Sequence, residues 1–315
     1  MEHLRRRMLG ASWLLALATG CYASSAGELS EQLEMLGPSW VREHRGTYRG
    51  ILEHALSVDA YACEPAPAEV FFGHTPPGRR MISGTLPHYD FYHGPMSYQV
   101  QRRSDGWHVN VAIAVQSPAF EGRMELADCQ LVAQLEGDVE CHGRPYSSSS
   151  SREVCPKVGR FSAPITRRNV QSLLAHWSVA VQEYYNRDAR SFGLPISYDF
   201  EFYLIGAKQS SAQASLVLPF KTDCARSPYF HAVRSGWSLP ILAHEMGHTL
   251  GLLDEYERFS GIFDFYPKAP YPGAERSRMG LSMKAHTVVL PLHHYLVLRR
   301  YFCPVSQDAP FAVSF

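Results

Sequence analysis

Residues 244–256 read HEMGHTLGLLDEY and combine the residue types that bind and use a metal ion. His244 and His248 are four positions apart, so on a helix their imidazoles lie on one face and can bind the same ion. Glu245 points slightly off that face, where its carboxylate can take a proton from a water that the metal activates. The spacing predicts two zinc ligands and a general base.

A third ligand has to come from beyond this helix. Asp254 follows in the sequence, but an unbroken helix would carry it about 15 Å along the axis from His244, whereas a ligand bond to zinc is about 2 Å long. Gly251 lies between them, and glycine readily adopts the left-handed conformation that ends a helix. We therefore expect the chain to fold back at Gly251, so that His244, His248 and Asp254 hold a single catalytic Zn²⁺.

The bounds of this helix follow from its flanking residues. Ser238 is suited to the N-cap and Pro240 to the first turn, which predicts a helix over about Leu239–Leu250. Three alternatives stay open. The segment can be an ordinary amphipathic helix, it can bind metal without catalysis, or Glu255 can replace Asp254 as a ligand.

The same residues resemble the zinc-binding motif of the metzincin metalloproteases, in the variant where aspartate is the third ligand, as in snapalysin-like enzymes. The run LLDEY is similar to the IgA-peptidase-like metallopeptidases. The resemblance covers roughly residues 160–305 and implies a zinc-dependent peptidase with a methionine turn beneath the metal. Met279 in SRMG is the residue it assigns to that turn, with Met283 as the reserve. It also implies a strand that pairs with an extended substrate, for which we expect Ala214–Phe220.

The first residues predict export. Arg5, Arg6 and Arg7 precede an uncharged apolar run over residues 8–20, which is too short to anchor in a bilayer and is typical of a signal peptide. The run ends at Cys21 in a pattern that resembles the lipobox of bacterial lipoproteins, so we expect a lipid at Cys21 as the membrane attachment. The alternative is a plain secretory signal cut near Ala23 or Ala26.

Cysteine usage fits export. The chain has seven cysteines, and setting Cys21 aside leaves an even number suited to disulfides in an oxidising compartment. Many pairings are possible, and we favour Cys224 with Cys303. The six remaining cysteines are Cys63, Cys129, Cys141, Cys155, Cys224 and Cys303.

Charge limits the partners. Lys plus Arg and Asp plus Glu are balanced at 30 each, and no basic stripe indicates nucleic acid. The expected partner is a protein or peptide substrate, and the sequence leaves the oligomeric state open.

Pattern along the chain predicts an α+β protein, in which a small antiparallel β domain precedes the domain that carries the zinc helix. For that second domain the resemblance implies a metzincin-like catalytic fold with a mixed sheet and a long helix. Strands alternate at period two on both sides of the turn at residues 104–106. The expected segments are 1–20 (signal peptide), 21–59 (tether or helix), 60–146 (β-rich domain), 147–156 (serine-rich linker) and 157–315 (catalytic domain).

Within these segments further elements are expected. They are strands at Ser97–Arg103, Trp107–Val115, Met124–Leu135, Val139–His142, Ile196–Ile205, Ala214–Phe220 and Tyr229–Val233, and helices at Thr166–Arg190 and Val288–Phe302.

Other histidines could approach the cleft, but such residues more often lie in the core or on the surface. They are His231, His286, His293 and His294. The function expected from the sequence is an exported zinc endopeptidase. Two alternatives are a metal-dependent amidase acting on cell-wall peptides and a non-catalytic, zinc-containing surface lipoprotein.

Overall fold

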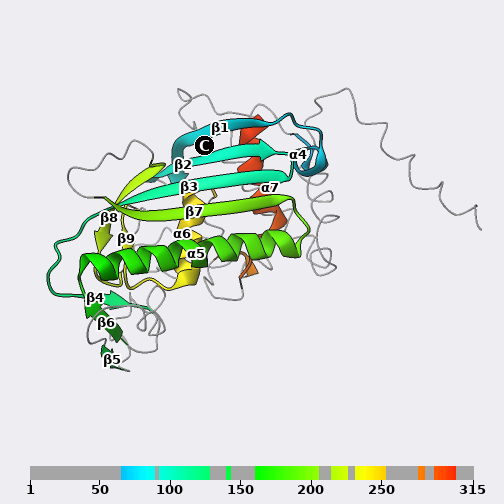
Figure 1. Cartoon of the computed structure of the whole chain (residues 1–315). Helices are drawn as coiled ribbons and strands as arrows, with labels where there is room; N and C mark the ends of the chain where they lie inside the picture. Colours follow the sequence, from blue (N-terminus) through cyan, green and yellow to red (C-terminus); the bar gives the residue numbers. More distant parts are fainter. Residues whose placement is uncertain are drawn as a thin grey trace, which may run out of the picture.

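The structure is a computed structural model that describes residues 65–88, 92–127, 140–142, 160–205, 214–225, 231–252, 276–280 and 287–302. Figure 1 shows its elements. In chain order they are α4 (Pro67–Phe72), β1 (Gly78–His88), β2 (Tyr92–Arg103), β3 (Gly106–Gln116), β4 (Arg123–Leu126), β5 (Glu140–His142), β6 (Arg160–Pro164), α5 (Arg167–Ser191), β7 (Ile196–Ile205), β8 (Leu216–Lys221), β9 (Val233–Arg234), α6 (Leu239–Thr249) and α7 (Pro291–Phe302).

The main sheet is mixed, and β3 is its central strand. Along one edge β3 pairs with β7 in parallel over its whole length. The other edge is shared, because β2 pairs antiparallel with the first half of β3 and β8 pairs parallel with the second half. β1 extends the sheet beyond β2, and β9 extends it beyond β8. The protein is therefore α+β with a mixed sheet, as the sequence predicts at that level.

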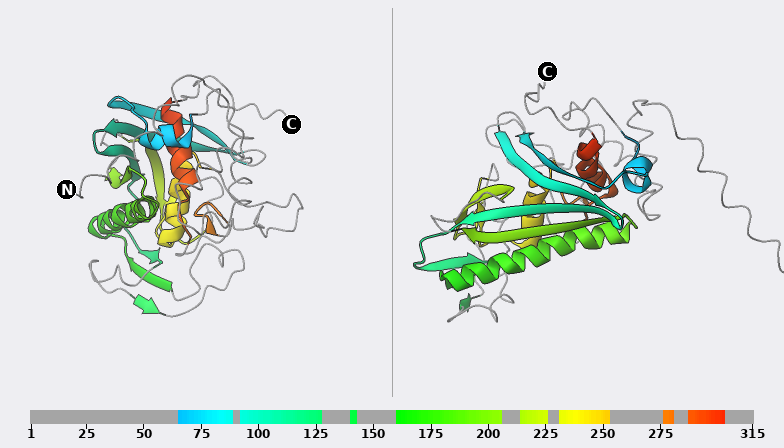
Figure 2. Two further views of the ribbon diagram at one scale, coloured as in Figure 1. Left: turned by 90° about the vertical axis from the view of Figure 1, so that its right-hand side faces the viewer. Right: turned by 45° about the horizontal axis from the view of Figure 1, so that its top comes forward.

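Helices α5, α6 and α7 lie on one face of this sheet (Figure 2). Alternate residues of β7 are buried, from Ile196 at its start to Leu204 near its end, and the residues between them are half-buried or exposed. Tyr185 of α5 packs against Phe200 of β7, and the neighbouring Tyr198 contacts α7. This one-sided burial holds the helices together over a single hydrophobic core.

The structure differs from the expected division into two domains. The strand predicted at Trp107–Val115 is β3, and it pairs with β7, which the sequence assigned to the other domain. A parallel pair needs a long crossover connection, and α5 supplies it. Period-two alternation identifies a strand but carries no information about its partner, so the strands over residues 78–116 join the main sheet. The serine-rich linker lies outside the described residues.

A separate three-stranded sheet also draws on both expected domains. Its order is β4-β6-β5, with β6 antiparallel to each neighbour. The sequence predicts strands at Met124–Leu135 and Val139–His142, which follow one another in the chain, whereas in the sheet β6 lies between β4 and β5. β4 is also shorter than the predicted Met124–Leu135, of which residues 128–135 lie outside the described part.

The helix expected at Thr166–Arg190 is confirmed as α5. Thr166 is its N-cap, and the side-chain oxygen accepts a hydrogen bond from the backbone N–H of Asn169 at 3.1 Å. The helix ends before Gly193, whose φ is +66°. In the ranges that the structure describes, no helix is both long enough and apolar enough to cross a membrane.

β8 occupies most of the predicted segment Ala214–Phe220. It pairs with β3 through residues 216–219 and with β9 through Phe220 and Lys221. At Phe220 and Lys221 one edge of β8 is already paired with β9. The pairing with a substrate that the resemblance implies therefore has no support at these two residues.

Candidate metal centre

The helix that carries the motif has the expected position. α6 runs from Leu239 to Thr249, with Ser238 at the N-cap position and a proline in the first turn. It ends in a Schellman motif, in which the N–H of Gly251 donates to the carbonyl of His248 and the N–H of Leu252 donates to that of Gly247, both at 3.0 Å. Gly251 has a φ of +80°, the left-handed conformation that such an ending requires. The chain thus reverses direction where the sequence predicts.

His244 and His248 present their rings together from one side of α6. The two ring centroids are 5.0 Å apart and the ring planes are nearly perpendicular, at 87°. Both residues are almost completely buried. Two imidazoles at this spacing can serve a shared ion from successive turns of a helix.

Hydrogen bonds orient both rings. The Nδ1 of His244 lies 2.9 Å from the carbonyl oxygen of Arg278, and the Nδ1 of His248 lies 2.8 Å from that of Leu252. A carbonyl oxygen can only accept, so each Nδ1 carries a proton, and Nε2 is the ring nitrogen that can offer a lone pair to a metal. This is the tautomer of a histidine that binds a metal through Nε2 while a backbone carbonyl orients it from behind. The two residues therefore fit a zinc ion.

A tight turn lies against the same helix. The N–H of Gly280 donates to the carbonyl of Ser277 at 3.1 Å, and the N–H of Met279 donates to the Ser277 hydroxyl at 3.0 Å. Met279 is fully buried, and a Cβ built on Gly247 would overlap its sulfur. Glycine at position 247 therefore lets the turn approach α6 between the two histidines.

Arg300 of α7 fixes the end of α6. Its buried guanidinium donates to the carbonyl of Leu250 at 3.2 Å and to that of Gly251 at 2.8 Å. The last carbonyls of a helix have no hydrogen-bond donor within the helix, and they carry partial negative charge. A buried guanidinium donates to these carbonyls and also neutralises that charge. A Cβ built on Gly251 would lie 2.6 Å from this guanidinium and would overlap the sulfur of Met96.

We expect Gly251→Ala to destabilise the fold more than the left-handed conformation alone explains. Gly193→Ala is the matched control, because Gly193 also has a positive φ but has open space around it. The control should lose about 1–2 kcal/mol of unfolding free energy from conformation. Gly251→Ala should lose about 1–3 kcal/mol more, because it also overpacks the Met96 and Arg300 side chains. Urea denaturation measures both, and equal losses would contradict the crowding at Gly251.

Glu245 is only partly buried, whereas its neighbours in α6 are buried. Asp254, the predicted third ligand, lies outside the described residues, as do Glu255, Met283, Cys21 and His286. Within the described ranges no group of three His, Cys, Asp or Glu side chains is close enough to hold a metal ion.

The remaining predicted histidines have other positions. His293 is buried at the start of α7, where its Nδ1 accepts the N–H of Leu290 at 3.0 Å in the manner of a capping box. His294 is fully buried, and its Nδ1 is 2.7 Å from the hydroxyl of Tyr198. Burial lowers the pKa of His294 to about 3, with a smaller contribution from His293. His231 is exposed.

Several residues that shape the site had no signal in the sequence. Burial raises the pKa of Tyr185, whose hydroxyl donates to the carbonyl of Ala243 in α6 at 2.8 Å. Burial also raises the pKa of Asp188 and lowers that of Arg278. Tyr185 and Asp188 lie on α5 and Arg278 lies in the turn at residues 276–280, so a pattern search around HEMGH does not reach them.

A Ser–His–Asp contact lies on the other face of the sheet. Ser197 Oγ is 2.9 Å from Nδ1 of His108, and Nε2 of His108 is 3.0 Å from Asp105 Oδ1. The hydrogen bond with His108 lowers the pKa of Asp105. The Asp105 side chain is 67% exposed. A catalytic triad acts in a site that excludes water, so we assign these contacts to the surface of the β3–β7 pair.

Comparison with protein-family models, with curated proteins and with solved structures gave no match for this chain. Function is therefore inferred from the chemistry of the residues themselves.

Proposed function

We propose that the protein is an exported zinc-dependent endopeptidase with a metzincin-like catalytic domain. The observation that carries the proposal is the pair of buried imidazoles on α6, each oriented by a carbonyl behind its Nδ1. The reversal at Gly251 supports it, because it turns the chain back three residues before Asp254. The packing of Met279 against Gly247 is compatible with the methionine turn that the resemblance implies.

In this proposal the residues have separate roles. His244 and His248 hold the zinc ion through Nε2, and Asp254 completes the ligand set. The bound ion supplies Lewis acidity that polarises the scissile carbonyl and makes water more acidic. Glu245 accepts the proton of the attacking water and delivers it to the leaving amine. The buried surroundings of the two rings keep bulk water away from the ligand bonds.

An oxidising location agrees with the cysteine chemistry. Cys224 is disulfide-bonded. A Cβ built on Gly236 would overlap the Cβ of Cys224, so the disulfide lies tightly against the segment that leads into α6. Stable disulfides are typical of exported proteins. The proposed lipid at Cys21 and the pairing with Cys303 stay predictions.

Metal removal tests the proposal. The purified full-length protein should contain a single zinc ion by elemental analysis and should cleave an unfolded protein substrate. A chelator should abolish cleavage and added Zn²⁺ should restore it, because the ion is required for the chemistry. His248→Ala should lose the zinc, whereas Ser197→Ala should keep zinc and activity as the control.

Three results would overturn the endopeptidase. Zinc retained in His248→Ala would place the ion elsewhere. Cleavage of peptidoglycan without cleavage of protein would favour a cell-wall amidase. Zinc bound with neither substrate cleaved would favour a structural site.

A further inference from the structure

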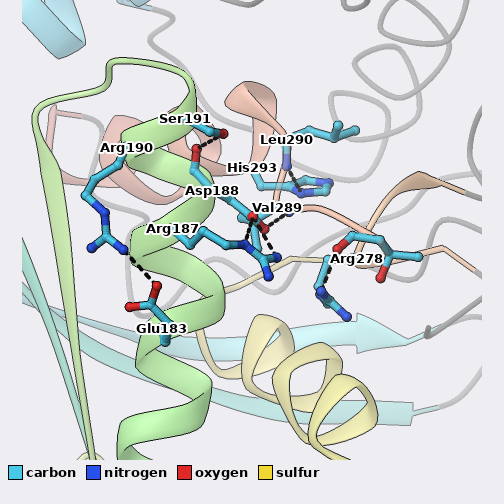
Figure 3. A network of polar contacts seen from close by, with 10 residues as sticks. Glu183, Arg187, Asp188, Arg190, Ser191, Arg278, Val289, Leu290 and His293 are labelled. Atoms are coloured by element: carbon cyan, nitrogen blue, oxygen red, sulfur yellow. Dashed lines mark hydrogen bonds and ion pairs between the residues drawn. The ribbon is translucent and has the colours of Figure 1, made fainter. Parts of the chain in front are cut away.

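We propose that Asp188, a buried carboxylate of α5, is a positioning residue for the metal-binding ring of His244. The inference rests on the proposed function, since it concerns how the zinc ligand is oriented. Three hydrogen-bonded links connect the carboxylate with the imidazole. Figure 3 shows Asp188 beside Val289, with Arg278 on the segment next to them.

The first link joins α5 to the segment before α7. Asp188 Oδ2 accepts the backbone N–H of Val289 at 2.8 Å. Its Oδ1 accepts a hydrogen bond from Nε of the Arg187 guanidinium at 3.0 Å and forms an ion pair with the terminal nitrogen at 2.9 Å. The Asp188 side chain is 3% exposed, whereas that of Arg187 is 47% exposed. The carboxylate therefore reaches inward from α5 and holds residue 289 by its backbone.

The second link joins that segment to the turn at residues 276–280. The N–H of Arg278 donates to the carbonyl of Val288 at 2.7 Å, and the N–H of Val288 donates to the carbonyl of Arg276 at 2.9 Å. The Arg278 guanidinium donates to the carbonyl of Thr287 at 2.5 Å and lies 4.4 Å from the centre of the Tyr184 ring. Because of these hydrogen bonds, a displacement of residues 287–289 would also displace the turn.

The third link is the bond from His244 to the turn. Its Nδ1 donates to the carbonyl of Arg278, the residue that the second link fixes on both its backbone and its side chain. Because the imidazole is rigid, the position of this acceptor sets the direction of the Nε2 lone pair. A shift of the turn would therefore rotate the lone pair away from the ion.

A carboxylate suits the first position better than an apolar side chain. Burying a charge is costly unless hydrogen bonds satisfy it, and Asp188 has a backbone N–H and a guanidinium as donors. Charge-assisted bonds are shorter and stronger than neutral ones. Burial raises the pKa of Asp188, while Val289 and Arg187 act against that rise. Arg278 also favours the charged form from the turn itself.

The test compares Asp188→Ala and Asp188→Asn with Glu183→Gln. Glu183 is the matched control, because it is an acidic residue of the same helix whose ion pair with Arg190 is exposed. Zinc affinity of the folded full-length protein is measured by chelator competition. Asp188→Ala should bind zinc about tenfold more weakly, the scale seen when support behind a ligand is removed. Asparagine should rescue part of the loss, because its carbonyl can still accept the Val289 N–H.

A second readout separates positioning from stability. The NMR signal of the His244 Nδ1 proton should shift or exchange faster in Asp188→Ala, and stay unchanged in Glu183→Gln. Wild-type zinc affinity in both Asp188 variants, with only a lower melting temperature, would overturn the inference and leave the proposed function standing. Failure of the wild-type protein to bind zinc would instead overturn the proposed function. If the alanine variant does not fold, the asparagine variant alone decides between these outcomes.

Discussion

Replacing Glu245 with glutamine should abolish nearly all turnover while leaving zinc in place. General acid–base catalysis typically accelerates a reaction about 10²- to 10⁴-fold, so we expect kcat to decrease by a factor within that range. Glutamine preserves the size of the side chain but cannot accept the proton of an attacking water. His244 and His248 keep their orienting hydrogen bonds, since neither of these involves residue 245.

The kinetic pattern distinguishes this role from substrate binding. A group that acts only in the transition state lowers kcat and kcat/KM together and leaves KM nearly unchanged. Glu201→Gln is the control, because Glu201 is exposed on β7 and its replacement removes the same charge elsewhere. Cleavage at the wild-type rate by Glu245→Gln would remove Glu245 from the mechanism. Loss of zinc in that variant would make Glu245 part of the metal site instead.

Sequence reasoning succeeded where structure is local. The first-turn proline and the glycine of α6 act within a few residues, so their pattern predicts the bounds of the helix and the φ of Gly251. Ser238 occupies the N-cap position, but its side chain makes no capping hydrogen bond. The same holds for α5 and for the hairpin of β2 and β3. α7 begins at Pro291, three residues later than predicted, because proline favours the first helical position and breaks a longer helix.

Contacts between residues that are far apart in the sequence could not be predicted from local patterns. The pairing of β3 with β7 joins residues about 90 positions apart, and alternation in each strand is the same for any partner. The supports of the site are equally distant in sequence. Arg278 accepts the His244 hydrogen bond through its backbone carbonyl, which any residue type provides. Arg300 reaches Gly251 from α7, and only the fold brings them together.

The stability of the fold should fall steeply with acid because of His294. This ring is fully buried, between Tyr198 of β7 and the rest of α7, and its Nε2 has no hydrogen-bond partner in the described part of the chain. Burial is the main reason that its pKa falls from 6.5 to about 3, and His293 adds to the effect. Tyr185 and Tyr198 also line this region, and burial raises the pKa of both, so neither is charged in acid.

The direction of the pH dependence of stability follows from the protons that each state binds. Between pH 6.5 and about 3 the unfolded chain binds a proton at His294 and the folded protein does not, so the full stability is present above pH 6.5 and is lost as pH falls. Each pH unit in this window removes about 1.4 kcal/mol of unfolding free energy, and the whole window approaches about 5 kcal/mol.

His294→Gln should flatten the acid dependence without restoring absolute stability. The substitution changes packing at every pH, but it removes the one proton that separates the folded and unfolded states at this position. Urea denaturation between pH 4.5 and 6 should give a slope lower than that of the wild type by about 1.4 kcal/mol per pH unit, and the two slopes should agree above about pH 7. Contributions from the metal site and from Asp188 are common to both proteins, so they cancel in the difference. His74→Gln, which removes an exposed histidine, should keep the wild-type slope, and an unchanged slope in His294→Gln would show that the buried ring takes up its proton without unfolding.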